Sequence, residues 1–237
     1  MRRTIFALDA LATLREAASA HEVDLTAAAT LAELAGADAV RLGIVEELVP
    51  MREEDVYAVR RVVRCLELRM PPSQGLLKVA LEARPDRVLL AGDSLDGRTP
   101  GVPLDLGGRG VALAPVLRAL TEAGIEVGGV VAPQLEAVKA AHAEGFGGVE
   151  LYTATLLELR PAERAEQQIA LGDAVRLAAK LHMRVGVAGG IGYRAVRELV
   201  DAAPAIDGVT VGRAAVARAQ LVGVDRALRD LRALVTA

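Results

Sequence analysis

Short runs of β-branched and aliphatic residues alternate with longer alanine- and leucine-rich segments about eight times along the chain. The short runs are typical of strands buried on both faces, and the longer segments are typical of helices. This alternation predicts parallel strands joined by crossover helices. We expect strands at Thr4–Ala10, Ala39–Ile44, Leu66–Met70, Arg87–Ala91, Glu126–Ala132, Gly148–Thr153, Arg184–Ala188 and Gly208–Val211.

The first predicted helix has clear start and stop signals. Asp24 or Thr26 can cap its N-terminus, and Gly36 ends it. The same Ala-Gly ending recurs at Ala123-Gly124. We expect its apolar residues to line one side: Ala28, Leu31, Ala32, Leu34 and Ala35.

Eight strand and helix units predict one domain over residues 1–237, folded as a closed (β/α)₈ TIM barrel. The alternative is an open doubly wound sheet, whose usual signature is a glycine-rich turn after the first strand. Here that stretch reads Leu8-Asp9-Ala10-Leu11-Ala12-Thr13-Leu14, without glycine. The glycine-rich turns come at the end of the chain, which favours the barrel.

Those two turns predict a phosphate site. One is Gly189-Gly190-Ile191-Gly192 before a helix, and the other is Gly212 followed by Arg213. Glycines expose backbone N–H groups that can cradle an anion, and Arg213 adds a charged donor. Either turn alone would be explained by backbone geometry, but together after the last two strands they indicate phosphate binding.

Composition excludes several classes of function. The net charge is only −3 and the positive residues are spread along the chain, so we expect no nucleic-acid or membrane partner. The single cysteine, Cys65, allows no internal disulfide. Without a long uncharged apolar run, we expect a cytoplasmic protein, and no ligand spacing for a metal or need for a cofactor is evident.

Charged residues occur on strands that should otherwise be apolar. Asp9, Glu67 and Glu150 are candidate catalytic carboxylates, and Arg41 and Arg69 are candidates for binding a second anionic group. The alternative is an ion-pair layer that satisfies itself within the barrel. The irregular segment Gly92 to Gly110 follows the fourth strand and is a candidate lid.

The chain resembles the pyridoxine 5′-phosphate synthase family over nearly its whole length. The resemblance lies in the order and spacing of several motifs. They are Leu8-Asp9-Ala10-Leu11-Ala12-Thr13-Leu14-Arg15, Ala35-Gly36-Ala37-Asp38, Arg52-Glu53-Glu54-Asp55-Val56, Leu104-Asp105, Ala123-Gly124-Ile125-Glu126-Val127, Val149-Glu150-Leu151-Tyr152-Thr153 and Val211-Gly212-Arg213-Ala214. The resemblance implies substrate contacts at Asp9, Arg15, Glu150 and Thr153, a partial match at Thr99-Pro100, and a symmetric octamer.

The family condenses deoxyxylulose 5-phosphate with an amino-ketone phosphate, using histidines and a glutamate as acid and base. By this resemblance the catalytic positions fall on Gly43, Arg69 and Gly189, which cannot transfer protons. Two further family histidines correspond to Ala10 and Arg213. The chain's own histidines are His142 and His182, expected at helix ends far from the mouth, and His21, a candidate relocated acid or base.

Three functions remain open at this point. The first is altered chemistry on a phosphorylated small molecule. The second is a non-catalytic ligand-binding, regulatory or structural relative, and the third is an authentic synthase with relocated catalytic groups. A mouth filled by mutually paired Arg41, Glu67 and Arg69 would favour the second.

Overall fold

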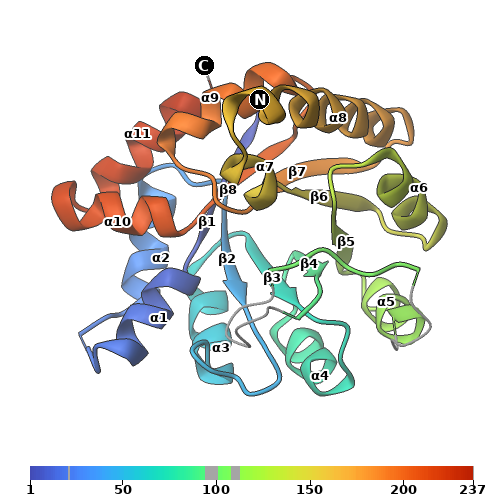
Figure 1. The fold of residues 1–237 in the computed structure, drawn as a ribbon. Helices are drawn as coiled ribbons and strands as arrows, with labels where there is room; N and C mark the ends of the chain where they lie inside the picture. Colours follow the sequence, from blue (N-terminus) through green and yellow to red (C-terminus); the bar gives the residue numbers. More distant parts are fainter. Residues whose placement is uncertain (21, 94–100, 108–112, 237) are drawn as a thin grey trace.

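A computed structural model describes residues 1–20, 22–93, 101–107 and 113–236. Eight parallel strands close into a barrel in which each strand pairs with the next and β8 returns to β1. Figure 1 shows the helices arranged around this barrel. The strands are β1 Arg3–Ala7, β2 Ala39–Gly43, β3 Leu66–Met70, β4 Arg87–Leu90, β5 Glu126–Val131, β6 Gly148–Tyr152, β7 Arg184–Ala188 and β8 Gly208–Val211. The prediction of a (β/α)₈ barrel is confirmed.

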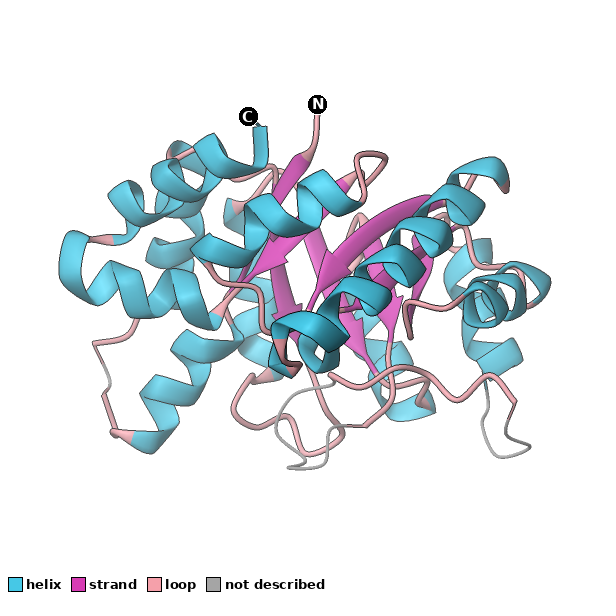
Figure 2. Cartoon of the chain, turned by 45° about the horizontal axis from the view of Figure 1, so that its top comes forward, coloured by secondary structure: helices cyan, strands magenta, loops and turns pink. Residues whose placement is uncertain are grey.

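The described residues form more helices than strands. The helices are α1 Asp9–Ala17, α2 Leu25–Leu34, α3 Glu53–Val62, α4 Gln74–Ala83, α5 Leu113–Glu122, α6 Leu135–Ala143, α7 Ala154–Glu158, α8 Pro161–Lys180, α9 Tyr193–Ala202, α10 Arg213–Val222 and α11 Val224–Thr236. Figure 2 shows them outside the strands, with the two chain termini at the same end of the barrel. No helix of the described residues is long and apolar enough to cross a membrane.

The start of the chain differs from the prediction. The first strand ends at Ala7 and not at Ala10, and helix α1 occupies Asp9–Ala17, ahead of the first helix that the sequence predicts. Alanine, leucine and arginine in this segment favour a helix, and Asp9 in the first turn and Arg15 in the last match the helix dipole. The helix therefore begins directly at the mouth of the barrel.

Helix α2 confirms its predicted boundaries. The Asp24 carboxylate accepts hydrogen bonds from the backbone N–H groups of Thr26 and Ala27, at 2.8 and 3.0 Å. Gly36 follows the helix with a φ of +97°, a conformation that only glycine adopts without strain. The expected apolar side was partly wrong, because Leu31 and Leu34 are 43% and 69% exposed.

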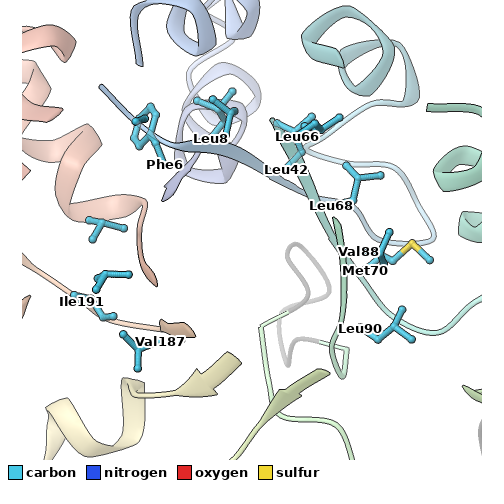
Figure 3. Close-up of a cluster of buried hydrophobic side chains, with 14 of the residues drawn as sticks. Phe6, Leu8, Leu42, Leu66, Leu68, Met70, Val88, Leu90, Val187 and Ile191 are labelled. Atoms are coloured by element: carbon cyan, nitrogen blue, oxygen red, sulfur yellow. The ribbon is translucent and has the colours of Figure 1, made fainter. Parts of the chain in front are cut away.

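The main hydrophobic core lies between the barrel and its helices. Outward-facing residues of the strands, such as Phe6, Leu42 and Leu68, are completely or almost completely buried. Figure 3 shows part of this cluster, which continues through Met70 and Leu90. In each strand, apolar residues that face outward into this core alternate with residues that face inward. The strands can therefore form a barrel although some of the inward-facing residues are charged.

Three aspartates fasten the beginnings of neighbouring strands. Asp38, Asp86 and Asp207 each precede a strand. Their carboxylates accept hydrogen bonds from the backbone N–H groups of Thr4, Leu66 and Val185, at 2.8, 2.8 and 2.7 Å. Each contact joins two strands at the N-terminal end of the barrel, so this end is fixed by hydrogen bonds to charged acceptors.

The bore of the barrel is divided into two unequal halves. Strands β1 to β4 send most of the long charged side chains inward, whereas β5 to β8 each carry a glycine that faces the bore, at Gly128, Gly148, Gly186 and Gly208. A Cβ built on Gly148 would lie 2.6 Å from Arg87 Nη2, and one on Gly208 would lie 2.8 Å from Ile5 Cδ1. Small residues on one half therefore make room for large residues from the other.

Candidate functional site

A ladder of alternating charge crosses four neighbouring strands inside the barrel. The strand register pairs Arg41 with Glu67, Glu67 with Arg87, and Arg87 with Glu126. Because each pair is directly opposite across a parallel ladder, every cation has an anion beside it. The expected alternative of an ion-pair layer is present in this part of the bore.

Arg41 lies at the centre of this layer and is 1% exposed. Its Nη2 and Nε donate to Glu67 Oε2 at 2.6 and 3.2 Å, and its Nη1 donates to Glu150 Oε2 at 2.5 Å. Burial alone would lower the pKa of Arg41, but the two carboxylates outweigh it and raise the pKa. Both ends of the guanidinium are thus occupied by protein.

Glu67 is held in its ionised form. Burial would raise the pKa of this carboxyl, but Arg41, Arg87 and Arg3 together lower it below its ordinary value. The Arg3 contact is direct, since Nη1 lies 3.3 Å from Glu67 Oε1. A carboxylate held in this way is a poor proton carrier near neutral pH.

The mouth contains a second group of charges above this layer. Asp9 Oδ1 accepts from the Gly43 backbone N–H at 2.6 Å, and Asp9 Oδ2 accepts from Arg69 Nη2 at 3.2 Å. A Cβ built on Gly43 would lie 2.9 Å from Asp9 Oδ1, so the carboxylate fills the space that a larger residue at position 43 would need. Arg69 therefore pairs with Asp9 at the mouth and not with Glu67.

Glu150 has one free oxygen at this mouth. Its Oε2 accepts from Arg41 and from Thr210 Oγ1, the latter at 3.1 Å. Its Oε1 is buried without a hydrogen-bond partner in the described structure, and Arg69 Nη1 lies 3.9 Å from it. Arg69 Nε is likewise buried and unpaired. An acceptor and a donor are thus left available close together.

The turn after β7 is shaped by its glycines. Gly189 and Gly190 have φ values of +101° and +67°, and a Cβ on Gly189 would lie 2.9 Å from the Tyr152 ring. The Thr153 hydroxyl is 3.1 Å from the carbonyl oxygen of Ala188 and 2.7 Å from that of Gly189, with hydrogen-bond geometry to both. Thr153, expected to contact substrate, is used by the protein to hold this turn in place.

The turn after β8 lies beside the turn after β7. Gly192 is the N-cap of α9 and Gly212 is the N-cap of α10, and neither helix has a side-chain cap. A Cβ on Gly192 would lie 3.9 Å from the Ala214 side chain, which brings the two helix starts together. The first N–H groups of a helix have no partner within it, so this corner offers several donors to an anion. Arg213 begins α10 and is exposed.

Arg15 is paired with the neighbouring helix α3. Its Nη1 and Nη2 donate to the two oxygens of Asp55 at 2.8 and 2.7 Å, and its Nη2 also donates to the carbonyl oxygen of Pro50. The contact ties α1 to α3. The Arg15 guanidinium, for which the family resemblance implies a substrate contact, is therefore bonded within the protein.

The histidines and the predicted lid add little to the described mouth. His142 is in the last turn of α6, and His182 follows α8 just before β7, so both lie at the N-terminal end of the barrel, as expected. His21 and Thr99-Pro100 lie outside the described residues, as does part of the segment Gly92 to Gly110. Among the described residues, no cluster of three or more histidine, cysteine, aspartate or glutamate side chains is placed to hold a metal ion.

Four polar residues of the bore are not among the candidates that the sequence predicts. Thr210 supports Glu150, while Arg3, Arg87 and Glu126 extend the charged layer toward the N-terminal end. A signal was available, because each lies an even number of positions from an inward-facing residue of its own strand. The register between strands, however, cannot be read from one strand at a time.

The closed strands, the polar bore and the glycine turns at the last two strand ends define a (β/α)₈ barrel protein. The sequence model of the family described as "Pyridoxal phosphate biosynthesis protein PdxJ" matches residues 6–237. The chain belongs to this family. It is similar to pyridoxine 5′-phosphate synthases of Desulfatibacillum aliphaticivorans, at 33% identity with 96% of this chain and 95% of the relative covered. The synthase of Syntrophobacter fumaroxidans is also 33% identical, with 99% of each chain covered.

Solved structures share the fold at lower identity. Thiamine phosphate pyrophosphorylase from Pyrococcus furiosus matches with a TM-score of 0.60 and 17% identity, over 99% of this chain and 95% of that one. Mycobacterium tuberculosis tryptophan synthase matches with a TM-score of 0.64 and 16% identity, over 100% of this chain and 93% of that one. These likenesses support the barrel architecture alone.

Proposed function

We propose that this protein binds a phosphorylated small molecule of the kind handled by pyridoxine 5′-phosphate synthases. The phosphate would lie at the backbone N–H groups after Gly189, Gly190 and Gly212, with Arg213 as a charged donor. The organic part would extend over the mouth toward Glu150 and Arg69. This proposal rests on the N-termini of α9 and α10, which have no side-chain cap and lie close together at Gly192 and Ala214.

The mouth suggests what the organic part must offer. Glu150 Oε1 accepts hydrogen bonds and Arg69 Nε donates them, and both are buried without partners among the described residues. Leaving such groups unpaired is costly, so a ligand with a hydroxyl or amino group near a carbonyl or second hydroxyl would be favoured. The names of the relatives make a vitamin B6 precursor or product the first ligand to test.

Such binding is compatible with three roles. Catalysis with altered proton-transfer groups would rely on Glu150 or Asp9, which face the mouth. A non-catalytic ligand-binding role is favoured by the pairing of Arg41 with Glu67. This pairing keeps the Glu67 carboxylate ionised and bonded to Arg41. An authentic synthase would require turnover by these remaining groups.

By family resemblance, we also propose a homo-oligomer, with an octamer as the first arrangement to test.

Thermal unfolding tests ligand binding directly, since a ligand that binds only the folded state raises Tm. The ligands are inorganic phosphate, pyridoxine 5′-phosphate and deoxyxylulose 5-phosphate. We expect an organic phosphate to raise Tm by about 3–5 °C at roughly ten times its Kd, and Arg213→Ala to reduce the shift.

The control is Arg197→Ala, which removes an exposed arginine of α9 away from the helix start. It should leave the shift unchanged. Absence of any shift at millimolar ligand would contradict the proposal. Where binding is seen, product formation from deoxyxylulose 5-phosphate and an amino-ketone phosphate separates the catalytic role from the non-catalytic one.

A further inference from the structure

Two neighbours hold the carboxylate of Glu150 by the same oxygen. Its Oε2 accepts hydrogen bonds from Arg41 Nη1 at 2.5 Å and from Thr210 Oγ1 at 3.1 Å. Its Oε1 is buried without a hydrogen-bond partner in the described structure. Because both donors share Oε2, Oε1 is the acceptor that Glu150 can offer to a ligand at the mouth.

The two donors come from different parts of the barrel. Arg41 lies on β2 and also donates to Glu67, so it belongs to the ion-pair layer. Thr210 lies on β8, two residues before Gly212, and is buried. Its hydroxyl therefore ties the Glu150 carboxylate to the strand that carries one of the two glycine turns.

The hydrogen bond from Thr210 joins two strands that are not neighbours. Strands β6 and β8 each pair with β7, which lies between them. The residue of β7 opposite Glu150 is Gly186, and a Cβ built there would lie 3.9 Å from Glu150 Oε2. Since Gly186 has no side chain, the carboxylate of β6 and the hydroxyl of β8 can meet across β7.

The contribution of Thr210 to Glu150 is direction rather than charge. Arg41 already compensates the charge of the carboxylate. The last torsion angle of a glutamate side chain has a broad range, so a single donor leaves the carboxylate some freedom to turn. A second donor on the same oxygen restricts this rotation and decides which oxygen faces the mouth.

We infer that Thr210 is a positioning residue, which orients Glu150 so that Oε1 accepts a hydrogen bond from a hydroxyl or amino group of the ligand. This inference rests on the proposed function, because it requires an organic phosphate bound at the glycine turns. Thr210 acts through Glu150 and favours a phosphate ester that carries such a donor over inorganic phosphate, which has no organic part to reach Oε1.

Calorimetric titration of Thr210→Val with pyridoxine 5′-phosphate and with inorganic phosphate tests this role. Valine has nearly the shape of threonine but no hydroxyl. We expect the affinity for pyridoxine 5′-phosphate to fall by about three- to tenfold, and the affinity for inorganic phosphate to stay unchanged. Thr210→Ser keeps a hydroxyl and should restore the affinity for the organic phosphate.

Thr4→Val is the matched control. Thr4 is a buried threonine of β1 whose hydroxyl has no hydrogen-bond partner in the described structure, so its loss should change neither affinity. Unchanged affinities in Thr210→Val, or an equal loss for both ligands, overturn the inference and leave the proposed function standing. If the unaltered chain does not bind pyridoxine 5′-phosphate, the proposed function and this inference both fail.

A crystal structure of the unaltered protein with pyridoxine 5′-phosphate covers the case in which Thr210→Val does not fold. A ligand hydroxyl about 3 Å from Glu150 Oε1, with Thr210 still bonded to Oε2, supports the inference. A ligand that is bound at the glycine turns without contact to Oε1 overturns it, and the proposed phosphate site is then retained.

Discussion

Arg41 shows how a fully buried charge is retained by its surroundings. Its guanidinium is held between Glu67 and Glu150, and Thr210 supports the latter. Removing one member of such a group leaves the others buried without compensation, which costs far more than losing an ion pair at the surface. The sequence identified Arg41, Glu67 and Glu150 as unusual, but their pairing depended on strand register.

Arg41→Met should lower the free energy of unfolding by about 3–5 kcal/mol, because it leaves two buried carboxylates without their main partner. The matched control is Arg64→Met. It removes an arginine that is 82% exposed and paired with Glu33, and should cost at most about 1 kcal/mol. Urea unfolding measures both. Equal effects of the two substitutions would contradict a buried, coupled role for Arg41.

The lowered pKa of Glu67 predicts acid sensitivity. A carboxyl whose pKa is lowered in the folded state stabilises the protein above its unfolded value, near 4.5, and loses that contribution as pH falls through the folded pKa. Glu67→Gln should therefore destabilise the protein at neutral pH. The difference from the unaltered chain should narrow below pH 4.5. A difference that stays constant from pH 7 to pH 3 in urea unfolding would refute this assignment.

At the scale of elements, strands β5 to β8 carry glycine at positions where a larger side chain would point into the bore. Gly128 and Gly148 face the bore and leave room for the long side chain of Arg87 from β4. In a sequence, glycine within a strand indicates weakness or a close approach. Only the register reveals that these glycines face the same interior. The limits of the predicted strands were nearly correct. Which side chains fill the bore could not be predicted, because it depends on the register between strands.

Gly148→Ala tests this arrangement. Its methyl group would lie 2.6 Å from Arg87 Nη2 and 2.8 Å from the carbonyl oxygen of Arg184, so the free energy of unfolding should fall by about 1–3 kcal/mol. Gly147→Ala is the neighbouring control, because its nearest atom is 3.6 Å away and the residue is exposed. Chemical denaturation compares them. A Gly148→Ala variant as stable as Gly147→Ala would disprove the packing of Arg87 against β6.

Helix α1 explains the main error in the predicted elements. The segment from Leu8 continued an apolar run, which extended the predicted strand to Ala10. The chain leaves the sheet at Leu8, whose backbone N–H bonds to the Arg41 carbonyl oxygen, and Asp9 then begins the helix. The helix propensity of this segment, with Asp9 in the first turn, therefore outweighs the apolar pattern that predicted a strand. The result matters because it positions Asp9 at the mouth.

At the scale of the whole molecule, the sequence predicted the barrel and the places of its glycine turns, since both depend on local patterns in a fixed order. It did not predict which candidate residues are occupied by the protein itself. Arg15 is paired with Asp55, and Thr153 holds the Gly189 turn. Such contacts join residues far apart in the chain, so no local pattern reports them. The helix starts at Gly192 and Gly212, in contrast, have no side-chain cap.

Titration of pyridoxine 5′-phosphate into Ala214→Asp and Ala214→Asn, followed by calorimetry, tests the proposed phosphate site most directly. Ala214 is in the first turn of α10 beside Gly192, where an added carboxylate favours the helix but repels a phosphate. Asparagine has nearly the same shape without the charge. We predict that Ala214→Asp loses at least about tenfold in affinity, or roughly 1.4 kcal/mol, relative to Ala214→Asn. Equal affinity of the two variants, with both folded, would contradict phosphate binding between these helix starts.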